Sequence, residues 1–141
     1  MPPVSTSPSQ LPFDGITVVL SRCNEPGIGV ARELTAQGTP FRIYQKRPCN
    51  SSRSAAALAK LPAANVRMLD YNAGDECSAY LQYIYDEYDA LPPAVAFVQY
   101  ASEVQLMLPS VARTVRMALG SVHRLGFVAL GRHTFEGRWP A

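Results

Sequence analysis

ITVVLS, residues 16–21, is a run of β-branched and aliphatic residues whose length suits one strand. Residues 27–37 have the composition of a helix, and Gly38 follows them where a helix commonly ends. Residues 41–45 (FRIYQ) form a second short strand-like run. A strand, a helix and a second strand joined by short connections predict two parallel neighbours in one sheet.

Helix-like and strand-like segments keep alternating toward the C-terminus. In chain order they are a helix at 54–61, a strand at 66–71, a helix at 75–90, a strand at 94–99, a helix at 110–119 and a short strand at 127–130. This alternation predicts the α/β class, with a three-layer, Rossmann-like and mostly parallel sheet that carries helices on both faces.

The helix predicted at residues 75–90 has the clearest pattern. Asp75 and Glu76 fall in its first turn, where the helix dipole favours acidic side chains. An apolar stripe of the kind that packs on a sheet recurs at helical spacing: Cys77, Leu81, Ile84 and Tyr88. The tyrosines of this helix suit stacking on a sugar or base, but packing against the sheet is the favoured interpretation: Tyr80, Tyr83, Tyr85 and Tyr88.

Length and composition predict one folded domain. A chain of 141 residues with 48% hydrophobic and 17% charged residues suits a single globular core. Residues 1–13, which are rich in Pro and Ser, are predicted to be a flexible arm, and residues 14–141 a single α/β domain. The chain has neither an apolar run of membrane-spanning length nor a signal-peptide pattern, so we expect a soluble protein, cytoplasmic by default.

Charge is distributed unevenly along the chain. Residues 70–89 hold six acidic residues and no Lys or Arg, whereas arginines dominate after Glu103. Such asymmetry can steer a small anionic ligand toward one side of a domain, although differently charged solvated faces are the more ordinary explanation. The formal net charge of +2 predicts no partner class, and we expect no nucleic-acid partner.

The three cysteines, Cys23, Cys49 and Cys77, are odd in number and widely spaced. This pattern argues against a disulfide framework and against a structural zinc site. We expect Cys23 and Cys77 to be small core residues.

Polar side chains follow the ends of the predicted strands. In open parallel sheets, ligands bind in the crevice beyond the carboxyl ends of the strands. The residues predicted to gather there are Glu25 and Glu76 as catalytic groups, and Asn24, Lys46, Asn72 and Gln99 as ligand-binding groups.

Four of these segments resemble a known family in their order and motifs: VVLSRCNE, FRIYQKR, NAGDECSAYLQYIYDEYDALP and VAFVQ. They are similar to the domain of unknown function 3431 family over about residues 15–103. The family pattern has histidines where this chain has Ser78 and the stretch 100–102, which puts any chemistry that depends on them in doubt. The resemblance implies no established activity; by analogy of fold, it implies an arrangement similar to nucleotide-sugar glycosyltransferases.

The leading hypothesis is therefore a glycosyltransferase-like domain that binds a nucleotide sugar or related anionic ligand; whether it is an enzyme stays open. No Asp-x-Asp occurs, so a divalent metal is only one option, with Asp70 and Glu76 as the nearest pair of acids. One alternative is a non-catalytic binding or assembly module that keeps the fold without the chemistry. A less favoured one is a nucleotide binder related to short-chain dehydrogenases, suggested by Gly27 and Gly29.

Overall fold

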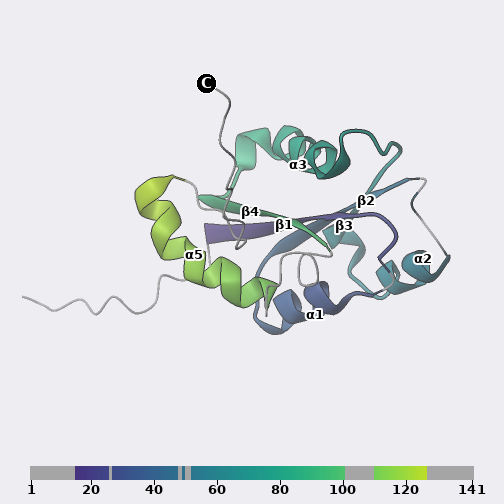
Figure 1. Cartoon of the computed structure of the whole chain (residues 1–141), viewed down its shortest axis with the longest axis horizontal. Coiled ribbons are helices and arrows are strands. Elements are labelled where there is room, and N and C mark those ends of the chain that lie inside the picture. Colours follow the sequence, from purple (N-terminus) through teal and green to yellow (C-terminus); the bar gives the residue numbers. More distant parts are fainter. Residues whose placement is uncertain (1–14, 26, 48, 50–51, 101–109, 127–141) are drawn as a thin grey trace, which may run out of the picture.

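The structure is a computed structural model that describes residues 15–25, 27–47, 49, 52–100 and 110–126 (Figure 1). The predicted arm at residues 1–13 and the predicted strand at 127–130 lie outside the described residues. In chain order the elements are β1 (Ile16–Arg22), α1 (Gly29–Ala36), β2 (Phe41–Lys46), α2 (Ser52–Leu58), η2 (Ala63–Asn65), β3 (Val66–Leu69), α3 (Asp75–Asp86), η3 (Tyr88–Ala90), β4 (Ala94–Gln99) and α5 (Val111–Leu125).

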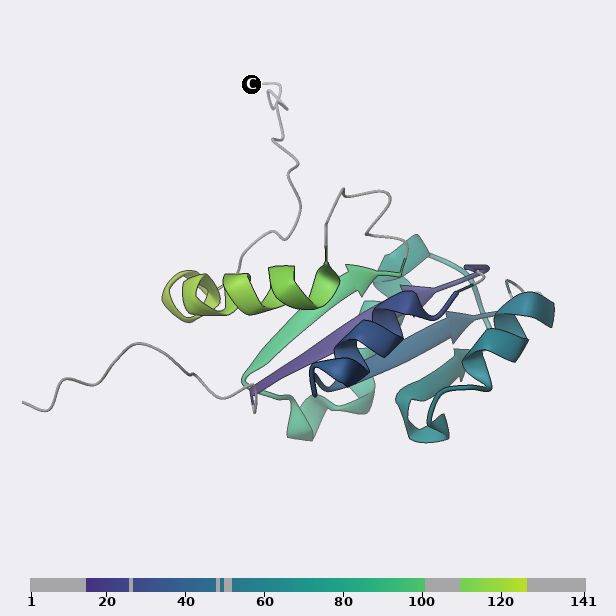
Figure 2. The ribbon, with the colours of Figure 1, turned by 90° about the horizontal axis from the view of Figure 1, so that it is seen from below.

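The four strands form one sheet in the order β3-β2-β1-β4, and every pair is parallel. Helices cover both faces (Figures 1 and 2), so the predicted α/β class and the three-layer, Rossmann-like arrangement are confirmed. The chain moves outward from β1 through β2 to β3 and then returns to the other side of β1 to form β4. The point between β1 and β4, where this direction reverses, is the topological switch point at which open α/β sheets bind ligands.

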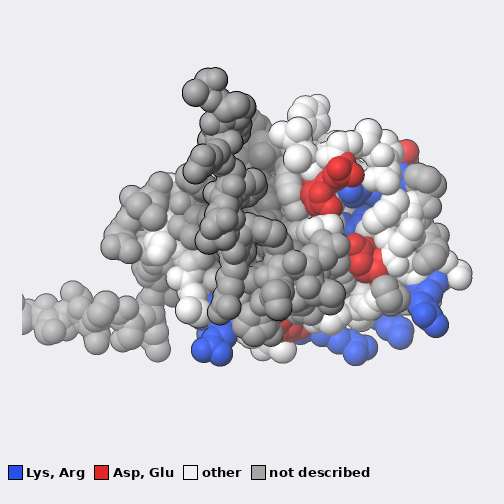
Figure 3. All heavy atoms as spheres, in the orientation of Figure 1, with Lys and Arg blue, Asp and Glu red and all other residues white. Residues whose placement is uncertain are grey.

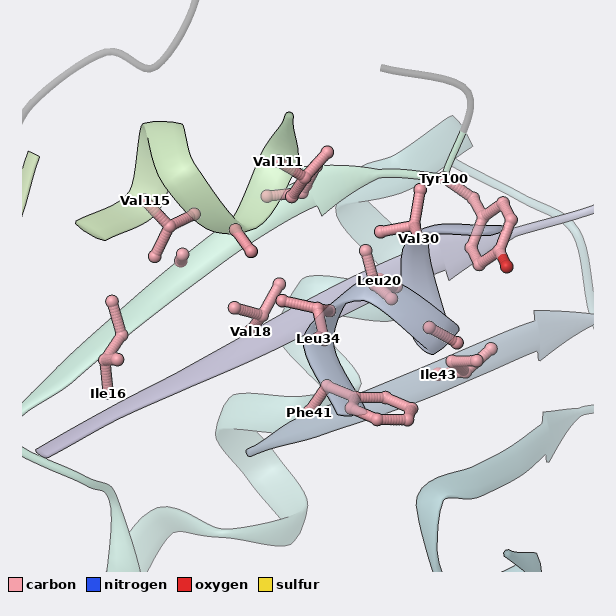
Figure 4. Packing of buried hydrophobic residues seen from close by; sticks show 14 of the residues in the cluster. Ile16, Val18, Leu20, Val30, Leu34, Phe41, Ile43, Tyr100, Val111 and Val115 are labelled. Atoms are coloured by element: carbon pink, nitrogen blue, oxygen red, sulfur yellow. The ribbon is translucent and has the colours of Figure 1, made fainter. Parts of the chain in front are cut away.

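Successive side chains along each strand point to opposite faces of the sheet, and each face belongs to its own hydrophobic cluster. On one face, α1 and α5 pack over strand residues that include Val18, Leu20 and Ile43 (Figure 4). On the other face, α3 packs its residues Ala79 and Tyr83 against a second cluster that includes Val19, Tyr44 and Leu69. Strand side chains of both faces are buried, as expected for a parallel sheet with helices on either side.

The α3 helix is turned differently from the prediction. Ala79 and Tyr83 face the sheet, whereas Leu81 is 65% exposed, Tyr85 79% and Tyr88 73%. The inward face carries the aromatic contacts, because the Tyr80 ring lies 5.0 Å from that of Phe97 and the Tyr83 ring 6.3 Å from that of Tyr44.

The predicted stripe of Cys77, Leu81, Ile84 and Tyr88 is therefore wrong as a core face, since its members are exposed except for the half-buried Ile84. The expectation that all four tyrosines pack on the sheet holds for Tyr80 and Tyr83 only.

Most other element boundaries lie within a few residues of their predictions. The helix predicted at 110–119 extends to Leu125, and its N-cap Ser110 accepts the backbone N–H of Arg113 at 3.0 Å. In the described part of the chain, no helix combines the length and apolar character needed to cross a membrane.

Candidate functional site

The carboxyl ends of β1 and β4 lie side by side at the switch point. Ser21 of β1 pairs with Gln99 of β4, and the backbone N–H of Tyr100 donates to the carbonyl of Ser21 at 2.9 Å. Asn24 and Glu25 follow directly after β1. Acidic side chains lie on either side of a small basic patch at this edge of the molecule (Figure 3).

Arg22, the last residue of β1, is completely buried on the α1 and α2 side of the sheet. Its Nη1 donates to Gln45 Oε1 at 2.8 Å and to Ser54 Oγ at 2.7 Å. Its Nη2 donates to the carbonyls of Glu25 and Gly27, the latter at 3.3 Å. Burial lowers the pKa of Arg22, against the opposing effects of Tyr100 and Glu25, but an arginine keeps its charge in a protein.

Lys46, the last residue of β2, is the second buried cation at this edge, with only 5% of its surface exposed. Its Nζ donates to the carbonyl of Asp75 in the first turn of α3, at 2.7 Å. Strand alternation places Lys46 on the α3 side and Arg22 on the opposite side. Within the described residues, neither cation forms an ion pair with a carboxylate.

The predicted site residues fall into two groups. The first group surrounds the N-terminal turn of α3. Lys46 contacts this turn directly, and Glu76 belongs to it. Burial raises the pKa of Tyr80, and the nearby charge of Glu76 raises it further. Tyr80 packs on Phe97, which shares its face of β4 with Gln99. The structure therefore brings Lys46, Glu76 and Gln99 to the α3 side of the switch point.

The second group gathers around a disulfide. Cys23 and Cys49 are bonded at 2.01 Å, and Asn72 Nδ2 donates to Cys49 Sγ at 3.1 Å. Glu25 Oε2 accepts the backbone N–H of Cys23 at 2.7 Å, and Asn24 beside it is exposed. Asn24, Glu25 and Asn72 are thus held near each other by the loops that follow β1, β2 and β3.

The cysteine predictions are wrong in two respects. A disulfide is present, because β1 and β2 are paired neighbours and the loops beyond their ends come together although 26 residues separate the two cysteines. Cys77, expected in the core, is a free and exposed cysteine.

The acidic residues build no metal centre in the described structure. Asp70, the proposed companion of Glu76, instead pairs with Arg47 at 2.9 Å on the surface. Across the described ranges, no three His, Cys, Asp or Glu side chains are grouped closely enough to hold a metal ion. The Oγ atom of Ser21, which is buried on the α3 side, has no hydrogen-bond partner among these residues.

The turn before α1 differs from a phosphate-binding turn. Such a turn directs backbone N–H groups at the ligand, whereas the carbonyls of Glu25 and Gly27 here point to Arg22. Neither Gly27 nor Gly29 has the positive φ that would require glycine. The resemblance of these two glycines to a dinucleotide motif therefore has no counterpart in the backbone.

Sequence reasoning missed four buried residues at this edge: Arg22, Gln45, Ser54 and Tyr100. The predicted first strand ends at residue 21, whereas Arg22 belongs to β1 and points inward. An arginine one residue beyond an apolar run has no pattern that marks it as buried. The one available signal was strand alternation, which continues from Val18 and Leu20 to Arg22.

The family comparison gives one match. The model of a family described as "Protein of unknown function (DUF3431)" matches residues 51–137, which is more than half of the chain. No curated protein and no solved structure matches. The matched region holds Asn72, Glu76 and Gln99, whereas the motifs around Asn24, Glu25 and Lys46 lie before it. The chain belongs to the DUF3431 family of proteins of unknown function.

Proposed function

We propose that this protein binds a nucleotide sugar or a related phosphate-bearing anion at the carboxyl edge of its sheet. The observation that carries the proposal is the pair of buried cations, Arg22 and Lys46, neither of which has a carboxylate partner among the described residues. Buried charges in proteins are normally paired, because removing an ion from water is costly. A bound anion would supply the missing negative charge.

The two cations have different roles in this proposal. The terminal nitrogens of Arg22 are used by Gln45, Ser54 and the loop carbonyls, so its charge acts through the electric field rather than by direct contact. Lys46 uses one donor on the carbonyl of Asp75 and keeps two further N–H groups for a ligand oxygen. The positive end of the α3 dipole adds to the attraction for an anion.

The remaining site residues suit the sugar or the reacting group. Asn24, Asn72 and Gln99 carry amides that can both donate to and accept from sugar hydroxyls. In a glycosyltransferase-like reaction, Glu25 and Glu76 would act as acid, base or ion-contacting groups.

The second candidate is a binding or assembly module without chemistry. The hydrogen bond from the Cys23 N–H to Glu25 Oε2 favours it, because this carboxylate already serves to shape its own loop. The two candidates share the anion site and differ only in whether a bound nucleotide sugar is consumed.

Thermal unfolding with nucleoside diphosphates and nucleotide sugars, with and without manganese, tests the shared proposal. A ligand at 100 times its Kd stabilises the folded protein by about 2.7 kcal/mol, which a shift of the unfolding midpoint reports. Lys46→Met should abolish this shift. Arg47→Gln, at the next position but on the surface in a salt bridge with Asp70, is the matched control and should keep it.

A midpoint that no member of the panel moves would overturn the proposal, as would a response that survives Lys46→Met. Hydrolysis of the bound nucleotide sugar, measured as free sugar released, then separates a glycosyltransferase-like enzyme from a binding module.

A further inference from the structure

Three helices, α1, α2 and α5, form one layer of the molecule. They pack on the same face of the sheet through one hydrophobic cluster, to which Val30 of α1, Leu58 of α2 and Val111 of α5 belong. Figure 2, seen from below, shows α5, α1 and α2 in succession across this side of the sheet. The sides of these helices that point away from the sheet therefore form one outward surface.

Basic side chains dominate this surface. Arg32 on α1, Arg53 on α2, Lys60 just beyond α2 and Arg113 on α5 are all exposed. None of the four forms an ion pair with a described carboxylate. We call these four residues the basic face. In Figure 3 the lower edge of the molecule, which this layer forms, is mostly basic.

Acidic side chains are scarce in this layer. Helices α1, α2 and α5 contain one carboxylate, that of Glu33, which is half-buried and accepts a hydrogen bond from the hydroxyl of Ser110. The exposed acidic residues of the described chain lie after β3, at the start of α3 and in η3: Asp70, Asp75 and Asp89. Such a separation of charge gives the layer a positive field that attracts anions.

Apolar groups accompany the cations. Met117, one helical turn after Arg113, is 72% exposed. Arg32 and Lys60 line a hollow of about 310 Å³ whose other lining residues include Ile28 and Leu61. A surface that combines unpaired cations with apolar contacts suits an anion that is itself partly apolar.

We propose that the basic face binds a membrane surface that contains anionic phospholipids. The four cations would pair with lipid headgroups, while Met117 enters the zone between the headgroups and the acyl chains. A bilayer presents its charge over a wide, even surface, which fits cations that stand on separate helices rather than in one cleft. Nucleic acids fit less well, because α1, α2 and α5 contain no Phe, Tyr or Trp on which bases could stack.

This proposal is independent of the anion site at the carboxyl edge. That site uses Lys46, which lies on the α3 side of the sheet, whereas the basic face lies on the outside of the other helix layer. The two proposals can therefore fail separately.

Sedimentation with lipid vesicles tests the basic face. Wild-type protein should bind vesicles of equal parts phosphatidylserine and phosphatidylcholine, and it should not bind vesicles of phosphatidylcholine alone. Raising the salt concentration from about 0.1 M to about 1 M shortens the Debye length from about 10 Å to about 3 Å and should weaken binding. Each cation near an anionic bilayer accounts for about fivefold in affinity, so Arg32→Gln/Lys60→Gln should weaken binding at least about tenfold.

Arg47→Gln/Arg67→Gln is the matched control. It removes the same charge from two exposed arginines outside the basic face, which pair with Asp70 and Asp86. This control should bind the mixed vesicles like wild type. Lys46→Met should also bind them like wild type, which separates the basic face from the anion site.

Three results would overturn the proposal. The first is wild-type protein that binds neither kind of vesicle, or both kinds equally well. The second is an equal loss in Arg32→Gln/Lys60→Gln and in the matched control, because net charge alone would then account for binding. The third is tighter binding to duplex DNA than to the mixed vesicles at equal concentrations of negative charge, which would assign the basic face to a nucleic acid.

Discussion

The guanidinium carbon of Arg22 lies 5.2 Å from the centre of the Tyr100 ring, across the switch point of the sheet. Arg22 ends β1, and Tyr100 directly follows β4. The same guanidinium group reaches Gln45 on β2 and Ser54 on α2. One buried side chain therefore links three strands and a helix at the edge where we place the ligand.

Replacing Arg22 should lower the free energy of unfolding by a measurable amount. Arg22→Met keeps an unbranched apolar stem but leaves Gln45 Oε1, Ser54 Oγ and the loop carbonyls without their donor. Buried groups that lose a partner cost about 1 to 3 kcal/mol each, with partial relief by water, so we expect a loss of about 2 to 4 kcal/mol. Urea unfolding measures it. Arg47→Met, on the surface, should change stability by less than about 0.5 kcal/mol, and equal effects of the two substitutions would contradict this account.

The disulfide should contribute substantially to stability. Cys23 and Cys49 close a loop across a sequence separation of 26 residues, for which the chain-entropy model gives about 3 to 4 kcal/mol. The double variant Cys23→Ser/Cys49→Ser should lose about this amount and should no longer respond to dithiothreitol. Denaturant midpoints with and without the reductant report both effects.

Cys77→Ser is the control for this experiment, since Cys77 is exposed and unbonded. It should match wild type in both conditions. Wild-type protein whose midpoint does not change on reduction would show that the bond does not form in solution.

Much of the fold follows from local pattern. Apolar runs beginning at Ile16, Phe41, Val66 and Ala94 gave all four strands, and short connections gave their parallel order. The cysteine pairing did not follow from local pattern, because it depends on which strand ends become neighbours. Cys23 and Cys49 meet only because β2 lies beside β1 in the sheet.

The orientation of α3 shows a second limit of pattern reading. Apolar residues occupy about two thirds of the circumference of this helix, so spacing alone does not choose the buried face. The choice is made by Tyr44 and Phe97 on the sheet, which offer aromatic partners to Tyr83 and Tyr80. The strands end within two residues of their predicted ends, whereas the inward direction of Arg22 was not foreseen.

Two glycines, one at the start of α1 and one just beyond its end, should respond in opposite ways to replacement by alanine. Gly29 begins the helix, and an added Cβ would meet no atom within 4 Å, so Gly29→Ala should stabilise by about 0.4 to 1 kcal/mol. Gly38 has a φ of +65°, so Gly38→Ala should destabilise by about 1 to 2 kcal/mol. Thermal midpoints compare the two variants. Loss of stability in Gly29→Ala would contradict this expectation, whereas loss of anion binding with retained stability would indicate close approach of a ligand to this turn.

Alkaline pH should destabilise the protein through its buried tyrosines. Burial raises the pKa of Tyr44, Tyr80 and Tyr83, and the bond from the Tyr44 hydroxyl to Asp86 at 2.8 Å raises that of Tyr44 further. Above pH about 10 the unfolded chain releases these protons while the folded chain keeps them. Stability is therefore unaffected by these groups below that pH and falls above it, by up to about 1.4 kcal/mol per pH unit for each tyrosine.

Urea unfolding from pH 8 to pH 11, which is from about two units below to about one unit above the ordinary tyrosine pKa, measures this slope. Tyr44→Phe and Tyr80→Phe should each reduce it, whereas Tyr85→Phe, at an exposed position, should not. A slope that is the same in all three variants would assign the alkaline loss to other groups.

Glu76→Gln separates a ligand-binding role from a purely structural one. The substitution keeps the volume of the side chain and removes its charge from the first turn of α3, where the helix dipole accounts for about 0.3 to 1 kcal/mol of stability. If Glu76 contacts a nucleotide sugar beside Lys46 and Gln99, affinity should fall at least about tenfold while stability changes by no more than this amount. Glu87→Gln, at the other end of the helix and away from the carboxyl edge, is the matched control and should bind like wild type. Calorimetric titration of both variants decides the matter: if Glu76→Gln also keeps full affinity, Glu76 serves only to complement the helix dipole and does not belong to the site.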